Sequence, residues 1–190
     1  VLNFGHGVFI ALGAFVATSV MAGLADWTGS ASLSHNLWAV FCAMAVAMVL
    51  AAAVGLAFER FIVRPVYGQH LKQILITMGG MIMGEELIKV IWGPQQIPLP
   101  LPEGLRGAWL WGDAAVEKYR VFAVGVGLVI FGLLGYVLNR TKIGLLIRAG
   151  VQDREMVESL GYRIRRLFVG VFVAGSALAG LGGVLWGLYQ

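Results

Sequence analysis

Three charged side chains lie inside an apolar stretch of this chain, where ionised groups are expensive. Glu85, Glu86 and Lys89 fall within residues 74–92. A charge near the middle of a membrane costs roughly 2.5–3.5 kcal/mol on the insertion scale. Glu85 precedes Lys89 by four residues, so a helix would pair them, with the Lys89 ammonium reaching outward. In the alternative interpretation, Glu85 or Glu86 lies on a polar pathway through the membrane.

A second candidate site is the N-terminal segment 2–7, of sequence LNFGHG, which precedes an apolar run. Asn3 can cap a helix, and the two glycines permit a break in the backbone. Broken helices are tolerated in membranes where they line a cavity, which is where transporters bind substrate. The simpler interpretation is an ordinary helix start with His6 packed at the interface. Asn3 and His6 are therefore candidate pathway residues.

The polar segment at residues 139–166 predicts a partner-binding element. Its 28 residues exceed what a passive connector in a compact bundle needs. The pattern predicts two short helices, Lys142–Ala149 and Asp153–Leu160, the second ended by Gly161 in a left-handed conformation.

The second of these helices is predicted to be amphipathic. Met156, Val157 and Leu160 would share an apolar face opposite Arg154 and Glu158. Such a helix fits a groove on a partner protein. The alternative is a helix lying flat on the membrane, drawn to anionic lipid by three nearby basic residues. These are Arg163, Arg165 and Arg166.

Motifs of enzymes and metal sites are absent from the sequence. It contains no G-x-x-x-x-G-K-[ST], H-E-x-x-H, G-x-S-x-G or C-x-x-C. The three histidines (His6, His35 and His70) are scattered over different loops, and Cys42 is the only cysteine. We therefore expect no metal, no cofactor and no enzymatic activity, and any ATP must be bound by another chain. An intramembrane enzyme would need a paired nucleophile and base, which no span carries.

Five hydrophobic stretches must position these residues. They are Val8–Leu24, Leu37–Phe58, Ile74–Trp92, Val121–Leu138 and Leu167–Tyr189. The second and the fifth carry no charged side chain, and each is long enough, at about 1.5 Å per helical residue, to cross a hydrocarbon core of roughly 30 Å. Hydrophobic residues make up 59% of the chain and charged residues 13%, against roughly 25% charged in a soluble domain. The sequence predicts an all-α, polytopic transmembrane helical bundle with about five spans.

The basic residues predict how the spans are oriented. Loops 59–73 and 139–166 carry three and seven Lys or Arg residues, whereas loop 25–36 carries none and loop 93–120 carries three. By the positive-inside rule, loops 59–73 and 139–166 face the cytoplasm. The net charge of +4 therefore reflects orientation in a membrane, and no nucleic acid is expected. The four prolines of loop 93–120 exclude a regular helix there.

Small residues recur at every fourth position of two spans. They are Ala43, Ala47, Ala51 and Gly55 in the second span, and Gly175, Ala179, Gly183 and Gly187 in the fifth. Such stripes let helix backbones approach closely in lipid. The favoured interpretation is packing within one bundle, and a homodimer face is the alternative.

Three groups of residues resemble sequence motifs of the permeases of branched-chain amino acid ABC transporters, in particular of their LivH-like half. The first is Asn3-Phe4-Gly5-His6-Gly7 followed by Gly13-Ala14, similar to the family's Asn-Phe-Ala-His-Gly signature. The second is Arg64-Pro65, Thr77-Met78-Gly79 and Trp92-Gly93-Pro94. The third comprises Thr141-Lys142-x-Gly144, Arg148-Ala149, Asp153-Arg154-Glu155, Leu160-Gly161 and the glycine-rich run 175–183. Together they cover essentially all 190 residues.

This resemblance implies a role and a set of partners. The chain would be a fragment of a permease of about 300 residues in the bacterial inner membrane. It would form a single transmembrane permease domain, with loop 139–166 as the cytoplasmic coupling loop. A LivM-like second permease, two ATPase subunits and a periplasmic binding protein would complete the importer. The coupling loop of ABC importers carries Glu-Ala-Ala-x-x-x-Gly; Glu155 and Gly161 keep its spacing, while Met156 and Val157 replace the alanines.

The implied ATPase-docking residues all fall in the coupling loop. They are Arg148, Asp153, Glu155, Met156, Leu160 and Gly161. Two other functions remain open at this point. Urea and short-amide permeases look very similar, and an ion-coupled secondary transporter would use Glu85 or Glu86 as its proton carrier and need no docking helix.

Overall fold

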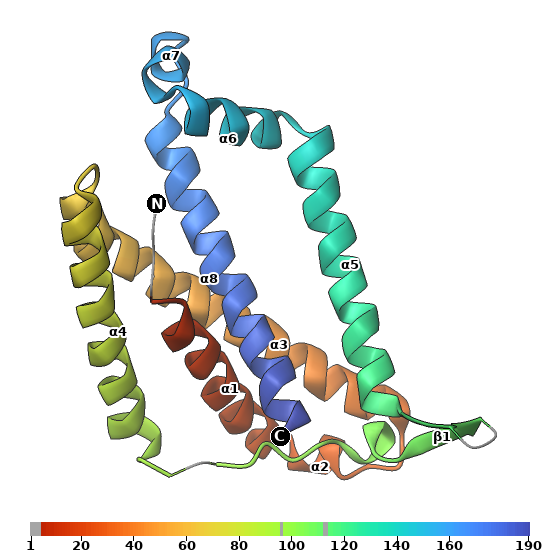
Figure 1. Ribbon diagram of the computed structural model, residues 1–190. Helices are drawn as coiled ribbons and strands as arrows, with labels where there is room; N and C mark the ends of the chain where they lie inside the picture. Colours follow the sequence, from red (N-terminus) through yellow and green to blue (C-terminus); the bar gives the residue numbers. More distant parts are fainter. Residues whose placement is uncertain (1–4, 96, 112–113) are drawn as a thin grey trace. The chain divides into compact units, whose positions relative to one another are not determined.

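Most of the polypeptide is helical (Figure 1). The computed structural model describes residues 5–95, 97–111 and 114–190. The elements in chain order are α1 (His6–Gly23), α2 (Ala25–Thr28), α3 (Leu33–Phe58), the π-helical turn η1 (Glu59–Val63), the 3₁₀ turn η2 (Arg64–Val66), α4 (His70–Trp92), the 3₁₀ turn η3 (Glu103–Leu105), β1 (Ala108–Trp111), β2 (Ala114–Glu117), α5 (Lys118–Arg140), α6 (Lys142–Gln152), α7 (Arg154–Ser159) and α8 (Ile164–Tyr189). All five predicted hydrophobic stretches are helices, so the all-α prediction is confirmed.

Four helical segments in the described part of the chain are long and apolar enough to cross a membrane. They are His6–Gly23, Leu33–Val66, Lys118–Arg140 and Ile164–Tyr189. The third predicted span, α4, is 23 residues long but carries charged residues at both of its ends, among them Lys72 and Glu85. The protein is therefore a multi-pass membrane protein, and its described residues contain four candidate spans and one more polar long helix.

The chain divides into two compact units. The first comprises residues 1–106 and 172–190, and thus contains α1, α3, α4 and most of α8. The second, residues 107–171, contains the β1–β2 hairpin, α5, α6, α7 and the first turns of α8. Along α5, no residue of the most apolar stretch is buried within its own unit.

Close helix packing in the first unit depends on small residues. Ala43, Ala47 and Ala51 are completely buried on α3. A Cβ on Gly55 would overlap the Ser176 side chain of α8. The α3 stripe therefore packs within this bundle, and the favoured sequence interpretation is confirmed for α3.

The predicted stripe on α8 is only partly correct. Gly183 packs on α1 against the backbone of Ile10, but a Cβ on Gly175 would have no atom within 4 Å. Gly180, outside the predicted stripe, makes a close approach to Gly13. A strict four-residue step drifts around a helix of 3.6 residues per turn, so the true contact face steps by four and by three.

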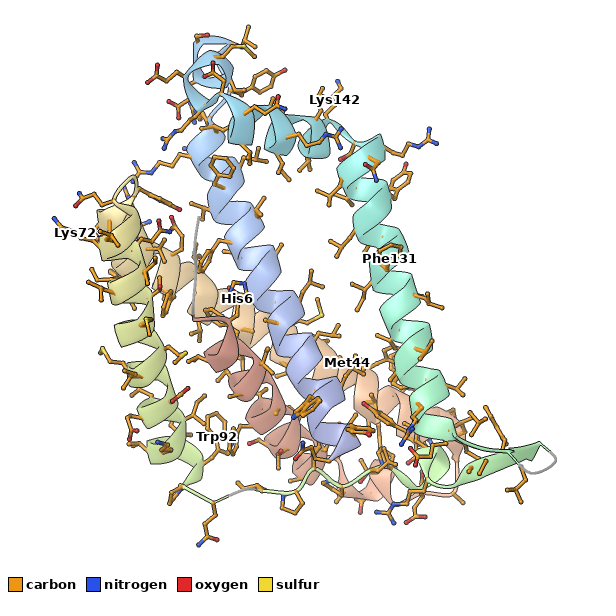
Figure 2. The ribbon with its side chains drawn as sticks, in the orientation of Figure 1. His6, Met44, Lys72, Trp92, Phe131 and Lys142 are labelled. Atoms are coloured by element: carbon orange, nitrogen blue, oxygen red, sulfur yellow. The ribbon has the colours of Figure 1, made fainter. Side chains whose placement is uncertain are left out.

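The directions of the helices fit the predicted alternation of crossings. On α1 and α4, Val8 lies beside Gly84, and Trp92 Nε1 donates a hydrogen bond to Ser19 Oγ at 2.8 Å, so these two helices run parallel. Figure 2 labels His6 at the start of α1 and Trp92 at the end of α4. On α3 and α8, Gly55 meets Ser176 and Ala51 meets Gly180, so these helices run antiparallel.

Three aromatic rings form the core where α1, α3 and α8 meet. The Phe9 ring centroid lies 5.7 Å from that of Phe58 and 6.3 Å from that of Phe172, in edge-to-face geometry. Phe58 and Phe172 are stacked. Aromatic pairs in these geometries stabilise a core beyond the area they bury.

The connector from α4 to α5 contains a hairpin that the sequence analysis did not predict. β1 pairs with β2 in antiparallel register, with Ala108 opposite Glu117 and Leu110 opposite Ala115. The available signal was a Gly-Asp pair at residues 112–113 between two apolar runs. Earlier in the connector, Leu99 and Leu105 are buried. This part of the connector therefore packs against the first unit.

Candidate functional site

The predicted docking segment is anchored by a tight corner between α5 and α6. The Thr141 hydroxyl accepts a hydrogen bond from the backbone N–H of Gly144, which caps α6. A Cβ on Gly144 would overlap the Leu138 carbonyl, so only glycine fits there. Figure 2 labels Lys142 at this corner, and Figure 1 shows α6 turning away from the end of α5 toward α7.

Arg148 holds the same corner from the other side. Its Nη1 donates to the Leu138 carbonyl oxygen at 2.6 Å and to Asn139 Oδ1 at 3.4 Å. A cation at the end of a helix satisfies carbonyls that have no partner within the helix and interacts favourably with the helix dipole. The predicted ATPase docking by Arg148 stays a prediction; within this unit, its guanidinium ties α6 to α5.

α7 confirms the predicted helix and its stop. Asp153 Oδ1 accepts a hydrogen bond from the Met156 backbone N–H at 2.9 Å, as an N-cap. At the other end, Gly161 has φ +84°, and its N–H donates to the Glu158 carbonyl at 3.0 Å. The first helix, α6, runs three residues further than predicted, to Gln152.

The apolar face predicted for α7 is divided between two directions. Met156 and Leu160 are 52% and 66% exposed, whereas Val157 is 1% exposed. Residues four apart stack on one side of a helix, while the next residue turns by about 100°. Val157 therefore anchors α7 in its own unit. Glu155, Met156 and Leu160 remain as an exposed surface, which we call the docking patch.

The predicted pathway residues at the N-terminus are only partly described. Asn3 lies outside the described residues. His6 is exposed at the first position of α1, and α1 continues without interruption to Gly23. The described part of this segment thus shows a helix start with Gly7 inside the helix.

The ion pair predicted on α4 has a different acidic partner. Lys89 Nζ lies 2.7 Å from Glu86 Oε1, three residues back, and both side chains are at least half exposed. The predicted Glu85–Lys89 pair is therefore wrong. Residues three apart and residues four apart are both neighbours on a helix, so Glu86 could take the place predicted for Glu85. Glu85 is also exposed. Both glutamates face away from the interior of their unit.

The buried polar groups of the first unit were missed by the sequence analysis. Glu59, 2% exposed, opens the π-helical turn η1 and accepts a hydrogen bond from the Tyr67 hydroxyl at 2.9 Å. Gln73 and Thr77 are buried on α4, and Gln73 Nε2 has no hydrogen-bond partner among the described residues. Glu59 looked like the start of a solvated loop, because a π-turn that continues α3 leaves no pattern in the sequence.

We expect Tyr67→Phe to lower the stability of the protein measurably. The change removes the hydroxyl that binds a buried carboxylate, and an unsatisfied buried group costs about 1–3 kcal/mol. Thermal unfolding of the purified protein in detergent measures this. Tyr162→Phe is the control, since Tyr162 is 52% exposed. Equal midpoints for the two variants would contradict a stabilising role for the Glu59–Tyr67 bond.

Comparisons with known proteins agree on one family. The family model described as branched-chain amino acid transport system / permease component matches residues 1–190. The permease protein BraD of a high-affinity branched-chain amino acid transport system from Pseudomonas aeruginosa is 27% identical, over 98% of this chain and 61% of its own length. The permease proteins LivH of Salmonella typhimurium and of Escherichia coli K12 are 27% and 26% identical, each over 99% of this chain and 61% of their own. No solved structure matches. The chain spans about three fifths of the length of these relatives.

Proposed function

Because the chain belongs to the family of permease components of branched-chain amino acid transport systems, we propose that it forms the membrane-spanning pathway of an ABC importer. Its family is one of transport permeases and not of enzymes. In this proposal, separate ATPase subunits supply the energy, a periplasmic binding protein delivers the solute, and a second permease completes the pathway. The solute is an aliphatic amino acid such as leucine, and the location is the bacterial inner membrane.

The observation that carries the coupling role is the docking patch on α7. Met156 on α7 and Leu160 at its C-cap expose apolar side chains, and this short helix is fixed at both ends. An exposed apolar pair on a rigid helix fits a groove on another protein. Of the predicted docking residues, Glu155, Met156 and Leu160 would touch the ATPase, whereas Arg148, Asp153 and Gly161 would hold the patch in place.

The connections of α7 explain how a movement of the ATPase would reach the membrane. One side continues through α6 to the Arg148-bound corner with α5. The other side continues through the Gly161 turn into α8. Closure of the ATPase pair would therefore pull on two spans at once, and rigid elements pass such displacements on without absorbing them.

The solute pathway itself is a proposal with narrower support. Asn3 and His6 stay candidates through the family resemblance, and His6 lies two residues before Val8, which contacts α4 at Gly84. Glu85 and Glu86 follow Gly84 directly but point outward. They would reach a pathway only where a second subunit packs against this side of α4.

The double variant Met156→Asp/Leu160→Asp tests the proposed function. Assembled with its native partners in proteoliposomes, the full-length permease should lose ATPase subunits on purification and lose ATP-driven leucine uptake. The reason is that two carboxylates would have to be desolvated in the docking groove. Val151→Asp on α6, at a residue 73% exposed, is the matched control and should keep both. Retention of the ATPase by the double variant would reject the docking patch, and uptake of urea in place of leucine would reject the proposed solute.

A further inference from the structure

A hollow of about 410 Å³ lies at the turn between α7 and α8. Its lining consists of Glu158 and residues 161–166. Three of these are arginines: Arg163, Arg165 and Arg166. We propose that this arginine cluster binds the phosphate headgroup of an anionic phospholipid of the cytoplasmic leaflet.

The charges around the hollow are unbalanced. In the described part of the chain, no carboxylate lies within ion-pair distance of the three guanidinium groups. The one acidic residue of the lining, Glu158, is already bound to Arg154 at 3.0 Å. Three like charges therefore line the hollow without a counter-charge of their own, which leaves a place for an anion.

The position of the cluster on α8 adds to this imbalance. Arg165 and Arg166 lie in the first turn of the helix, where its dipole is positive and cations are disfavoured. A helix beginning usually carries acidic residues, and the first turn of α8 has none. A phosphate in the hollow would offset the repulsion among the guanidinium groups and their repulsion from the helix end.

Depth in the membrane identifies the anion as a lipid headgroup. Directly after Arg166, residues 167–189 carry no charged side chain, and α8 is one of the candidate spans. The cluster therefore lies where the hydrocarbon ends and the lipid phosphates begin. Guanidinium groups bind phosphate oxygens in pairs, which is why arginine suits such a site better than a point charge.

The residue at the centre of the arginine cluster, Ile164, is held in place by packing. Ile164 is 1% exposed and packs against Gly150 of α6, where a Cβ would overlap the Ile164 side chain. The arginines on either side of Ile164 thus project from a fixed base. A bound lipid would therefore stabilise the same turn that joins α7 to α8.

The test uses the full-length permease with its partners in phosphatidylcholine nanodiscs. A photoactivatable phosphatidylglycerol is added, and cross-linked peptides are mapped by mass spectrometry. We expect the label on the peptide that contains residues 161–166. In the triple variant Arg163→Gln/Arg165→Gln/Arg166→Gln, lipid affinity should fall on the order of a hundredfold, because each basic residue near an anionic surface contributes about fivefold.

A matched triple variant separates a site from general attraction. Arg60→Gln/Arg64→Gln/Arg140→Gln removes the same charge from exposed arginines of the loops predicted to face the same side, and it should retain the lipid. Equal loss in both triple variants, or a wild-type label elsewhere, would overturn the proposal. So would displacement of the lipid by sn-glycerol 3-phosphate, which would indicate a soluble phosphate ester. If the Arg163→Gln/Arg165→Gln/Arg166→Gln variant bound lipid normally but lost the ATPase, the cluster would be assigned to protein docking instead. If a variant fails to insert, the positions of the cross-links in the wild-type permease still test the proposal.

Discussion

Gly183→Ala should strongly destabilise the helical bundle, although it adds a single methyl group. The new Cβ would overlap the carbonyl oxygen of Ile10 and crowd the backbone of Ala14. Backbone atoms cannot rotate away as a side chain can, so α1 and α8 would have to separate. Overpacking of this kind costs roughly 1–3 kcal/mol or more, and helices in lipid depend on such close approaches.

The neighbouring Gly182 provides a matched control, because a Cβ there would have no atom within 4 Å. Gly182→Ala should insert, purify and unfold like the wild type, whereas Gly183→Ala should unfold at a clearly lower temperature in detergent. Gly13→Ala should reproduce the defect from the α1 side, since its Cβ would overlap the Gly180 carbonyl. Identical unfolding of Gly182→Ala and Gly183→Ala would show that this α1–α8 contact does not exist.

Gly161→Pro should separate ATP hydrolysis from transport, on the proposed docking role of α7. Gly161 has φ +84°, whereas proline is held near −65° and has no N–H to donate to Glu158. The turn would have to refold, so the docking patch would no longer be rigidly joined to α8. We expect the permease to insert and the ATPase to hydrolyse ATP, while leucine uptake in proteoliposomes falls to background.

Gly161→Asn is the control for this change. Asparagine enters the left-handed region more readily than other non-glycine residues and keeps the N–H, so transport should largely survive. Glu155→Lys probes the same coupling without altering the backbone, by reversing a charge in the docking patch. Coupled transport in both Gly161→Pro and Glu155→Lys would remove α7 from the coupling path.

The sequence by itself determined the class of the molecule, its long helices and the two short helices of residues 139–166. These follow from local properties: uncharged runs of membrane length, caps such as Asp153, and a glycine at a helix end. The resemblance to the permease family likewise rests on residue types and spacings, and the match over residues 1–190 confirmed it.

Only the tertiary structure decided which residues face which partner. Val157 turned inward while Met156 and Leu160 stayed outside, because the surroundings of a helix, and not its sequence, choose the buried side. Arg148 joins α6 to the end of α5 by a hydrogen bond, and Glu59 is a buried group bound by Tyr67. Each of these roles depends on atoms from segments that meet only after the chain has folded, so spacing along one helix does not contain them.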